Sequence, residues 1–119
     1  LTLVAYGSMV PLAEQAADAL AGEAAVEVLD IRSLKPLDEE ALLASAAKTG
    51  RVVIVQEAPR TAGYGAELAA LIAEKALLSL EAPIVRVTGF DTPFPYTLEN
   101  EYMPSPDRVA LAIKQTAQF

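Results

Sequence analysis

The amino-acid sequence predicts an α/β fold, a three-layer sandwich in which helices cover both faces of a parallel sheet. Short apolar segments typical of strands alternate with amphipathic segments typical of helices, four times along the chain. This order is the pattern of parallel α/β sheets. The chain has 119 residues, of which 53% are hydrophobic. That is enough apolar material for one core, so we expect a single domain over residues 1–119.

Four segments have the composition of strands. Each is a short run rich in Val, Leu and Ile that ends at a polar or turn residue. The run from Val52 to Val55 is continuous and β-branched or aliphatic throughout, which is typical of a strand buried on both faces. The expected strands cover residues 1–6, 25–31, 51–57 and 84–88.

Capping residues mark the helix boundaries. Asp38 precedes a helix with an acidic first turn, and Gly50 follows that helix as its expected stop. Ser105 and Pro106 form a strong start signal for the last helix. Ser8 is expected to cap the first helix in the same way.

The two remaining segments differ in character. A long helix is expected over about residues 66–80. The stretch 90–104 contains three prolines and has neither a helical nor a strand period, so we expect a long loop there. Loops of this length inside a compact domain are often functional or interfacial.

Composition excludes several classes of function. The chain has 9 Lys and Arg against 16 Asp and Glu, a net charge of −7, which disfavours nucleic acid and anionic membrane surfaces as partners. It contains neither Cys nor His, so disulfides, thiolate nucleophiles and histidine-based catalytic triads or zinc sites are absent. No signal peptide or membrane span is recognisable, which favours a cytoplasmic location. The chain begins at Leu1 within a strand-like run, and we expect it to be a piece of a longer polypeptide.

The loop after the third strand is the most suggestive place for chemistry. Gly63 and Gly65 lie between a strand and a helix with Arg60 nearby, and a glycine-rich helix start can hold a phosphate. The stretch lacks the third glycine of a dinucleotide motif and the Lys of a P-loop, so a tight turn with close backbone packing is favoured. Glu57 could act as a general acid or base, but an ion pair with Arg60 is favoured. Ser8 could be a nucleophile only beside a base, so a helix cap is the better interpretation.

The late loop has two open interpretations. Its acidic side chains could meet a basic partner or form a solvated edge. Its aromatic side chains could form an interface patch or pack the loop onto its own domain. The acidic residues are Asp91, Glu99, Glu101 and Asp107, and the aromatic ones are Phe94, Tyr96 and Tyr102.

Read as a whole, the chain resembles the C-terminal domain of the transketolase family, and most closely that of the beta subunit of 2-oxoacid dehydrogenase decarboxylase components of pyruvate or branched-chain type. Four blocks carry the resemblance, in order and over nearly the whole chain. They are LVAYGSMV (3–10), VEVLDIRSLKPLD (26–38), TGRVVIVQEAPRTAGYGAE (49–67) and APIVRVTGFDTPFPY (82–96). One departure is Gln56-Glu57, where many relatives have two glutamates.

The resemblance implies a three-layer fold with a mixed five-stranded sheet whose one antiparallel strand lies at an edge. The fifth strand would be a short one in the late loop or at an end of the chain. The resemblance also implies that thiamine diphosphate and Mg²⁺ belong to the parent enzyme and bind between domains outside this chain. No catalytic, cofactor-binding or metal-binding residue is therefore expected here, and the isolated domain should be inactive.

The role that the resemblance implies is assembly. Arg60 and the loop Gly63, Tyr64 and Gly65 would contact the alpha subunit and a second beta subunit in a heterotetramer. Glu81 and Phe119 match the positions that dock the enzyme onto the basic peripheral subunit-binding domain of the dihydrolipoyl acyltransferase. Two alternatives stay open: the end of a transketolase or deoxyxylulose-phosphate synthase, and a free-standing module that binds an anion. The choice between pyruvate and a branched-chain acid also stays open.

Overall fold

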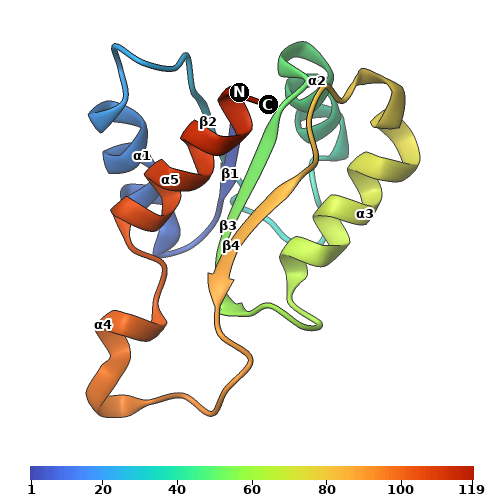
Figure 1. Cartoon of the computed structure of the whole chain (residues 1–119). Coiled ribbons are helices and arrows are strands. Elements are labelled where there is room, and N and C mark those ends of the chain that lie inside the picture. The colour runs from blue at the N-terminus through green and yellow to red at the C-terminus, as the bar shows by residue number, and fades with distance from the viewer.

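The computed structural model describes all residues, 1–119, and shows three layers (Figure 1). A sheet of four parallel strands forms the middle layer, with the strand order β2-β1-β3-β4. Its strands are β1 (Thr2–Ala5), β2 (Glu27–Asp30), β3 (Val52–Pro59) and β4 (Val85–Gly89). The predicted fold class is confirmed, and each expected strand is present.

A fifth, antiparallel strand is absent from residues 1–119, in contrast to the expectation. The late loop, one of its expected places, instead forms the short 3₁₀ helix η2 (Tyr96–Leu98) and the short helix α4 (Glu99–Tyr102). Pro93 and Pro95 lack the backbone N–H groups that a strand needs, which explains why the segment before η2 does not pair with β4.

Two helices cover each face of the sheet. Helices α1 (Met9–Ala19) and α5 (Pro106–Ala117) lie together on one face, and α2 (Glu39–Thr49) and α3 (Tyr64–Ala76) lie on the other (Figure 1). The helix expected over 66–80 is α3 followed by a 3₁₀ turn, η1 (Leu77–Ser79). None of the helices has both the length and the apolar character needed to cross a bilayer.

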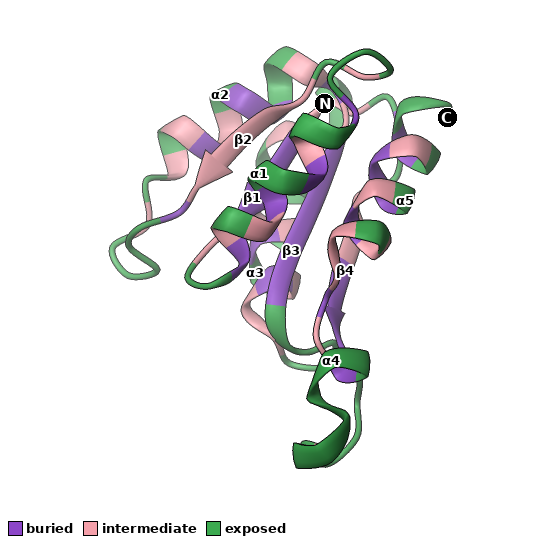
Figure 2. Cartoon of the chain, turned by 90° about the vertical axis from the view of Figure 1, so that its left-hand side faces the viewer, coloured by how far each residue is buried: buried purple, intermediate pink, exposed green.

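The sheet divides the core into two clusters. Val53 and Val55 on β3 pack toward α1 and α5, whereas Val52 and Ile54 pack toward α2 and α3. All four side chains are fully buried, and β3 runs through the centre of the molecule (Figure 2). Because successive side chains of a strand point to opposite faces, a continuous apolar run serves both clusters, as predicted.

The helix caps agree with the sequence at α2 and α5 but not at α1. The carboxylate of Asp38 accepts the Ala41 N–H at 3.0 Å, and the Ser105 hydroxyl accepts the Arg108 N–H at 3.2 Å. Gly50 ends α2 with φ of 66°. Ser8 stands at the N-cap of α1, but its side chain makes no capping bond. The expectation for Ser8 was wrong, because its backbone is already helical and its hydroxyl donates elsewhere.

Candidate functional site

The carboxyl ends of β1 and β3 form the topological switch point of the sheet. From β1 the chain continues into α1 on one face of the sheet, and from β3 it continues into α3 on the other face. Open α/β sheets bind ligands at such a point. The segment 90–104 extends beyond this end of the sheet as an arm, drawn in orange at the bottom of Figure 1.

A cleft of about 430 Å³ lies at this switch point. We name it the carboxyl-edge cleft. Its lining residues are Tyr6, Glu57, Ala58, Pro59, Thr92, Phe94 and Tyr102. They come from the end of β1, the end of β3 and the arm, so the cleft exists only because the fold brings these three segments together.

The side chain of Gln56 organises the loop after β3. It is fully buried, and its Oε1 accepts the Gly65 N–H at 2.5 Å. Its Nε2 donates to the carbonyl of Pro59 at 2.8 Å and, over 3.3 Å, to that of Ala58. One amide therefore bonds both the strand end and the start of α3.

Close packing against Gln56 explains the two glycines of this loop. A Cβ on Gly65 would lie 2.6 Å from the Gln56 Oε1, and a Cβ on Gly63 would lie 2.6 Å from the Pro59 carbonyl oxygen. Both distances are too short for non-bonded heavy atoms. The interpretation as a tight turn is confirmed, and the N–H of Gly65, in the first turn of α3, already has a protein acceptor.

The expected ion pair between Glu57 and Arg60 is absent. The Glu57 carboxylate instead accepts the Ser8 hydroxyl at 2.5 Å. The Arg60 guanidinium donates to the carbonyl of Arg86 at 3.2 Å, and that of Arg86 donates back to the Arg60 carbonyl at 3.1 Å. Arg60 is drawn away from Glu57 because β4, the neighbour of β3, offers a carbonyl acceptor at its outer edge.

Asp91 ties the exposed loop to the arm. Its two carboxylate oxygens accept the backbone N–H and the hydroxyl of Thr61, at 2.8 and 2.7 Å. The hydrogen bonds from Thr61 hold the pKa of Asp91 below its usual range. Thr61 belongs to the run 57–62, in which every residue is exposed.

The aromatic residues of the arm divide between the two roles left open by the sequence. Tyr102 is buried and packs edge to face against Phe94 and Phe90, with ring centroids 5.2 and 6.2 Å apart. Tyr96 remains 88% exposed. The arm is thus anchored by Tyr102 while it presents other apolar side chains to solvent.

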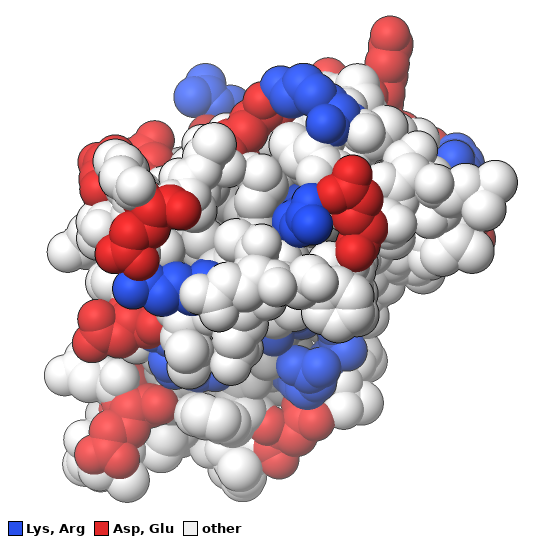
Figure 3. Space-filling model, turned by 45° about the horizontal axis from the view of Figure 1, so that its top comes forward, with Lys and Arg blue, Asp and Glu red and all other residues white.

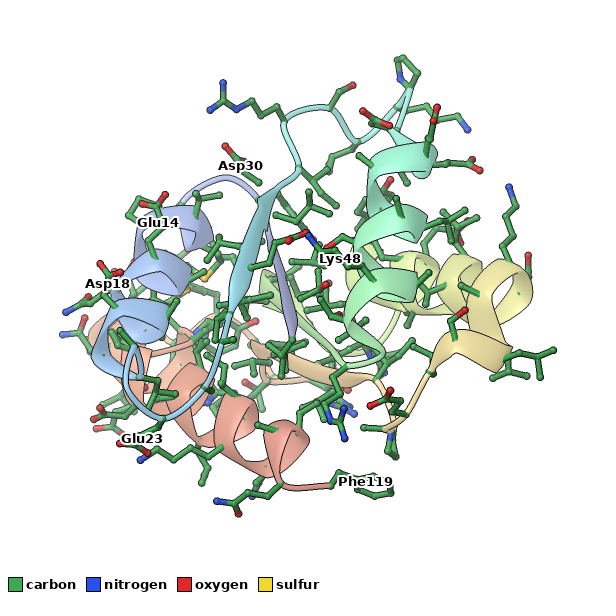
Figure 4. The ribbon with its side chains drawn as sticks, turned by 90° about the horizontal axis from the view of Figure 1, so that it is seen from above. Glu14, Asp18, Glu23, Asp30, Lys48 and Phe119 are labelled. Carbon is green, nitrogen blue, oxygen red and sulfur yellow. The ribbon has the colours of Figure 1, made fainter.

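Glu81 and Phe119 both lie at the opposite end of the sheet. Both line one shallow groove of about 620 Å³, which we name the docking groove. Its other lining residues are mostly apolar: Ala69, Ala73, Leu77, Leu80, Ala82, Pro83 and Ile84. Phe119 is 73% exposed at the C-terminal end of the chain (Figure 4). The carboxylate of Glu81 forms an ion pair with Arg51, which holds it at the wall of the groove.

Surface charge is unevenly matched. Acidic and basic side chains are interspersed on the face shown in Figure 3, and the chain as a whole forms ion pairs between such groups. Five such pairs, Arg32–Asp30, Lys48–Glu27, Arg51–Glu81, Lys75–Glu39 and Lys114–Glu23, use five of the 9 basic residues. Most of the 16 acidic residues have no basic partner, which leaves the surface negative.

Two observations bear on whether this chain could hold a diphosphate with its Mg²⁺. Nowhere do three or more acidic side chains gather in a way that could hold a metal ion. At the glycine-containing start of α3, the best candidate for a diphosphate, the Gly65 N–H is already bonded to the Gln56 amide. Sequence reasoning noted Gln56 only as a departure from relatives and missed its role in the loop. The signal that could have found this role is a polar residue that ends a β-branched run and precedes the glycines at 63 and 65.

Comparison with known proteins gives several strong matches. The 2-oxoisovalerate dehydrogenase subunit beta of Pseudomonas aeruginosa is 51% identical over 118 residues, which cover 99% of this chain and 33% of that protein. The pyruvate dehydrogenase E1 component subunit beta of Leifsonia xyli is 48% identical over 99% of this chain and 36% of its own length. The chain thus spans about a third of the length of these relatives.

A solved structure agrees. A chain titled "Split gene transketolase, inactive beta4 tetramer" superposes with a TM-score of 0.84 at 33% identity, over 98% of this chain and 38% of that one. The family described as "Transketolase, C-terminal domain" matches residues 1–109. Together with the three-layer fold, these matches show that the chain belongs to the transketolase C-terminal domain family.

Proposed function

We propose that this chain is the C-terminal assembly and docking domain of the beta subunit of a thiamine-diphosphate-dependent 2-oxoacid dehydrogenase. The parent enzyme would decarboxylate a 2-oxoacid oxidatively and transfer the acyl group to lipoyl groups. Relatives named for 2-oxoisovalerate and for pyruvate are nearly equally similar, which supports the class of substrate rather than one acid. The cofactor and its Mg²⁺ would bind in other domains, and the location would be cytoplasmic.

One observation carries the docking role. Glu81 and Phe119 lie far apart in the sequence, yet they line the same apolar groove. An acidic side chain beside an exposed aromatic ring suits a basic module such as the peripheral subunit-binding domain of the dihydrolipoyl acyltransferase. The net charge of −7 on the whole chain would attract that module from a distance.

Subunit contacts belong to the other end of the sheet under this proposal. Arg60 lies in the exposed run 57–62, and Tyr64 is half-buried beside it, with its hydroxyl bonded to the Leu34 carbonyl at 2.6 Å. Gly63 and Gly65 contribute indirectly, because they let the loop pack on Gln56. Alpha and second beta subunits would contact this loop.

The test is binding of a peripheral subunit-binding domain to this chain, measured by calorimetry. Glu81→Gln and Phe119→Ala should each weaken binding by about 1–2 kcal/mol. Leu111→Ala is the matched control for Phe119, because Leu111 is 58% exposed on α5 and does not line the groove. Unchanged affinity in both groove variants would refute the docking role.

The alternative of a free anion-binding module has less support. The N–H of Gly65 at the start of α3 is already bonded to Gln56, so an anion would have to displace a buried amide. A thermal shift in the presence of inorganic phosphate or a sugar phosphate would revive this alternative.

A further inference from the structure

We propose that the carboxyl-edge cleft binds an arginine side chain presented by another protein chain. The cleft lies at the switch point of the sheet, at the end opposite the docking groove. The proposal uses none of the residues that line the docking groove, so either can fail without the other.

The carboxylate of Glu57 supplies the charge. It is exposed, and its only hydrogen-bond donor is the Ser8 hydroxyl. Its basic neighbour in the sequence, Arg60, is engaged with Arg86 instead. Glu57 therefore lines a cleft with an unneutralised charge, held at a defined place by Ser8. A guanidinium bonds to carboxylates through two parallel N–H groups, so it matches this charge better than a compact ammonium does.

Aromatic walls supply the second part of the recognition. Tyr6, Phe94 and Tyr102 line the same cleft. Arginine packs its flat, weakly hydrated cation against such rings. The arm already contains this contact, because the Arg108 guanidinium lies 4.7 Å from the centroid of the Phe90 ring.

The surroundings of the cleft indicate a protein as the source of the arginine. Exposed apolar side chains continue from the cleft along the arm: Phe90 is 48%, Tyr96 is 88% and Leu98 is 52% exposed. A free cation would leave these side chains in water. A protein surface that inserts one arginine into the cleft would cover them as well, which is the usual arrangement of a central anchor with an apolar surround.

The experiment is an NMR titration of the chain with N-acetylarginine amide. We expect saturable shifts confined to the amides of Tyr6, Glu57, Thr92 and Phe94. N-acetylcitrulline amide, which has the same shape without the charge, should produce no saturable shift. Glu57→Gln should weaken the arginine probe roughly three- to fivefold, the range of an exposed ion pair. Phe94→Ala should weaken it similarly.

Controls separate the possible results. Glu99→Gln makes the same charge change on the arm but outside the cleft, and it should leave binding unchanged. Unaltered spectra away from the cleft would show that each variant is folded. Equal binding of citrulline, or no effect of Glu57→Gln, would overturn the cation site. Tighter binding of tetramethylammonium than of the arginine probe would overturn the assignment to arginine in favour of a free small cation.

Discussion

At the scale of single residues, the buried amide of Gln56 determines the shape of the loop that follows β3. It donates from one end and accepts at the other, which a carboxylate cannot do at neutral pH. A buried polar group of this kind stabilises the fold only while all its partners are in place. Gln56 therefore links the positions of residues 57–62 to the start of α3.

Gln56→Glu should destabilise the chain by about 1–3 kcal/mol near pH 7, because a buried carboxylate would face the Pro59 carbonyl without a proton to donate. Burial raises the pKa of such a carboxyl group above its unfolded value of about 4.3. The folded state of this variant therefore binds the proton more tightly than the unfolded state does. The free energy of unfolding should be regained as the pH falls toward about 4 and lost as the pH rises. Urea unfolding at several pH values measures this. Gln15→Glu, an exposed change of the same kind, should show no such dependence.

Gly63→Ala should destabilise the chain by about 1–3 kcal/mol, because the added Cβ collides with the Pro59 carbonyl. Gly22→Ala is the matched control: no atom lies within 4 Å of its Cβ position, and its φ is not positive. That variant should be neutral or slightly more stable. The free energy of unfolding from urea titrations compares the two. Equal stability of both variants would contradict the packing argument.

At the scale of elements, helix starts that share the same type of cap residue differ in how the residue is used. Asp38 and Ser105 bond the first turns of α2 and α5, whereas the hydroxyl of Ser8 bonds Glu57 on a neighbouring strand. Side chains also bond the backbone of the edge strand β4. The carbonyls of Arg86 and Thr88 accept hydrogen bonds from the guanidinium groups of Arg60 and Arg108. These bonds occupy an edge that would otherwise be free to pair with another strand.

Asp38→Ala and Ser105→Ala should each lower the free energy of unfolding by about 1 kcal/mol, because each leaves a backbone N–H of a first turn unpaired. Ser8→Ala removes no capping bond and should cost less than about 0.5 kcal/mol. Thermal or urea unfolding of the three variants checks the order. A cost for Ser8→Ala as large as for the other two would contradict this order.

At the scale of the whole molecule, the two surfaces available for partners lie at opposite ends of one sheet. The docking groove is at the amino ends of the strands, and the carboxyl-edge cleft is at their carboxyl ends. Between these two ends, helices cover both faces of the sheet (Figure 2). Under the two proposals, one domain would contact two partners at once without competition.

Net charge predicts the salt dependence of docking. The chain carries a net charge of −7, so a basic partner should associate faster at low ionic strength. Raising the salt from about 0.05 to 0.5 M should slow association about tenfold or more, since screening shortens the reach of these charges. The dissociation rate should change much less. Surface plasmon resonance resolves both rates, and an association rate independent of salt would contradict electrostatic steering.

Much of the fold is predictable from local sequence. The β-branched run Val52–Val55 predicts a fully buried central strand, and Asp38, Gly50 and Ser105 predict helix ends that the structure confirms. These features depend on backbone preference and hydrophobic period, which are written in adjacent residues. The arm is different, because its sequence has no clear helical period. Its two short helices, η2 and α4, accompany the packing of the Tyr102 ring against Phe94.

The sequence by itself determined the fold class, the places of the four parallel strands along the chain, the acidic surface and the absence of histidine and cysteine chemistry, but the fifth strand implied by the resemblance is absent from the sheet. Tertiary structure decided the partners of each polar side chain. It turned Ser8 toward Glu57 and Arg60 toward Arg86, and it brought Glu81 and Phe119 into one groove. The physical reason is range: helices and strands follow from neighbours along the chain, whereas hydrogen bonds and clefts form between segments that only the packed sheet brings together.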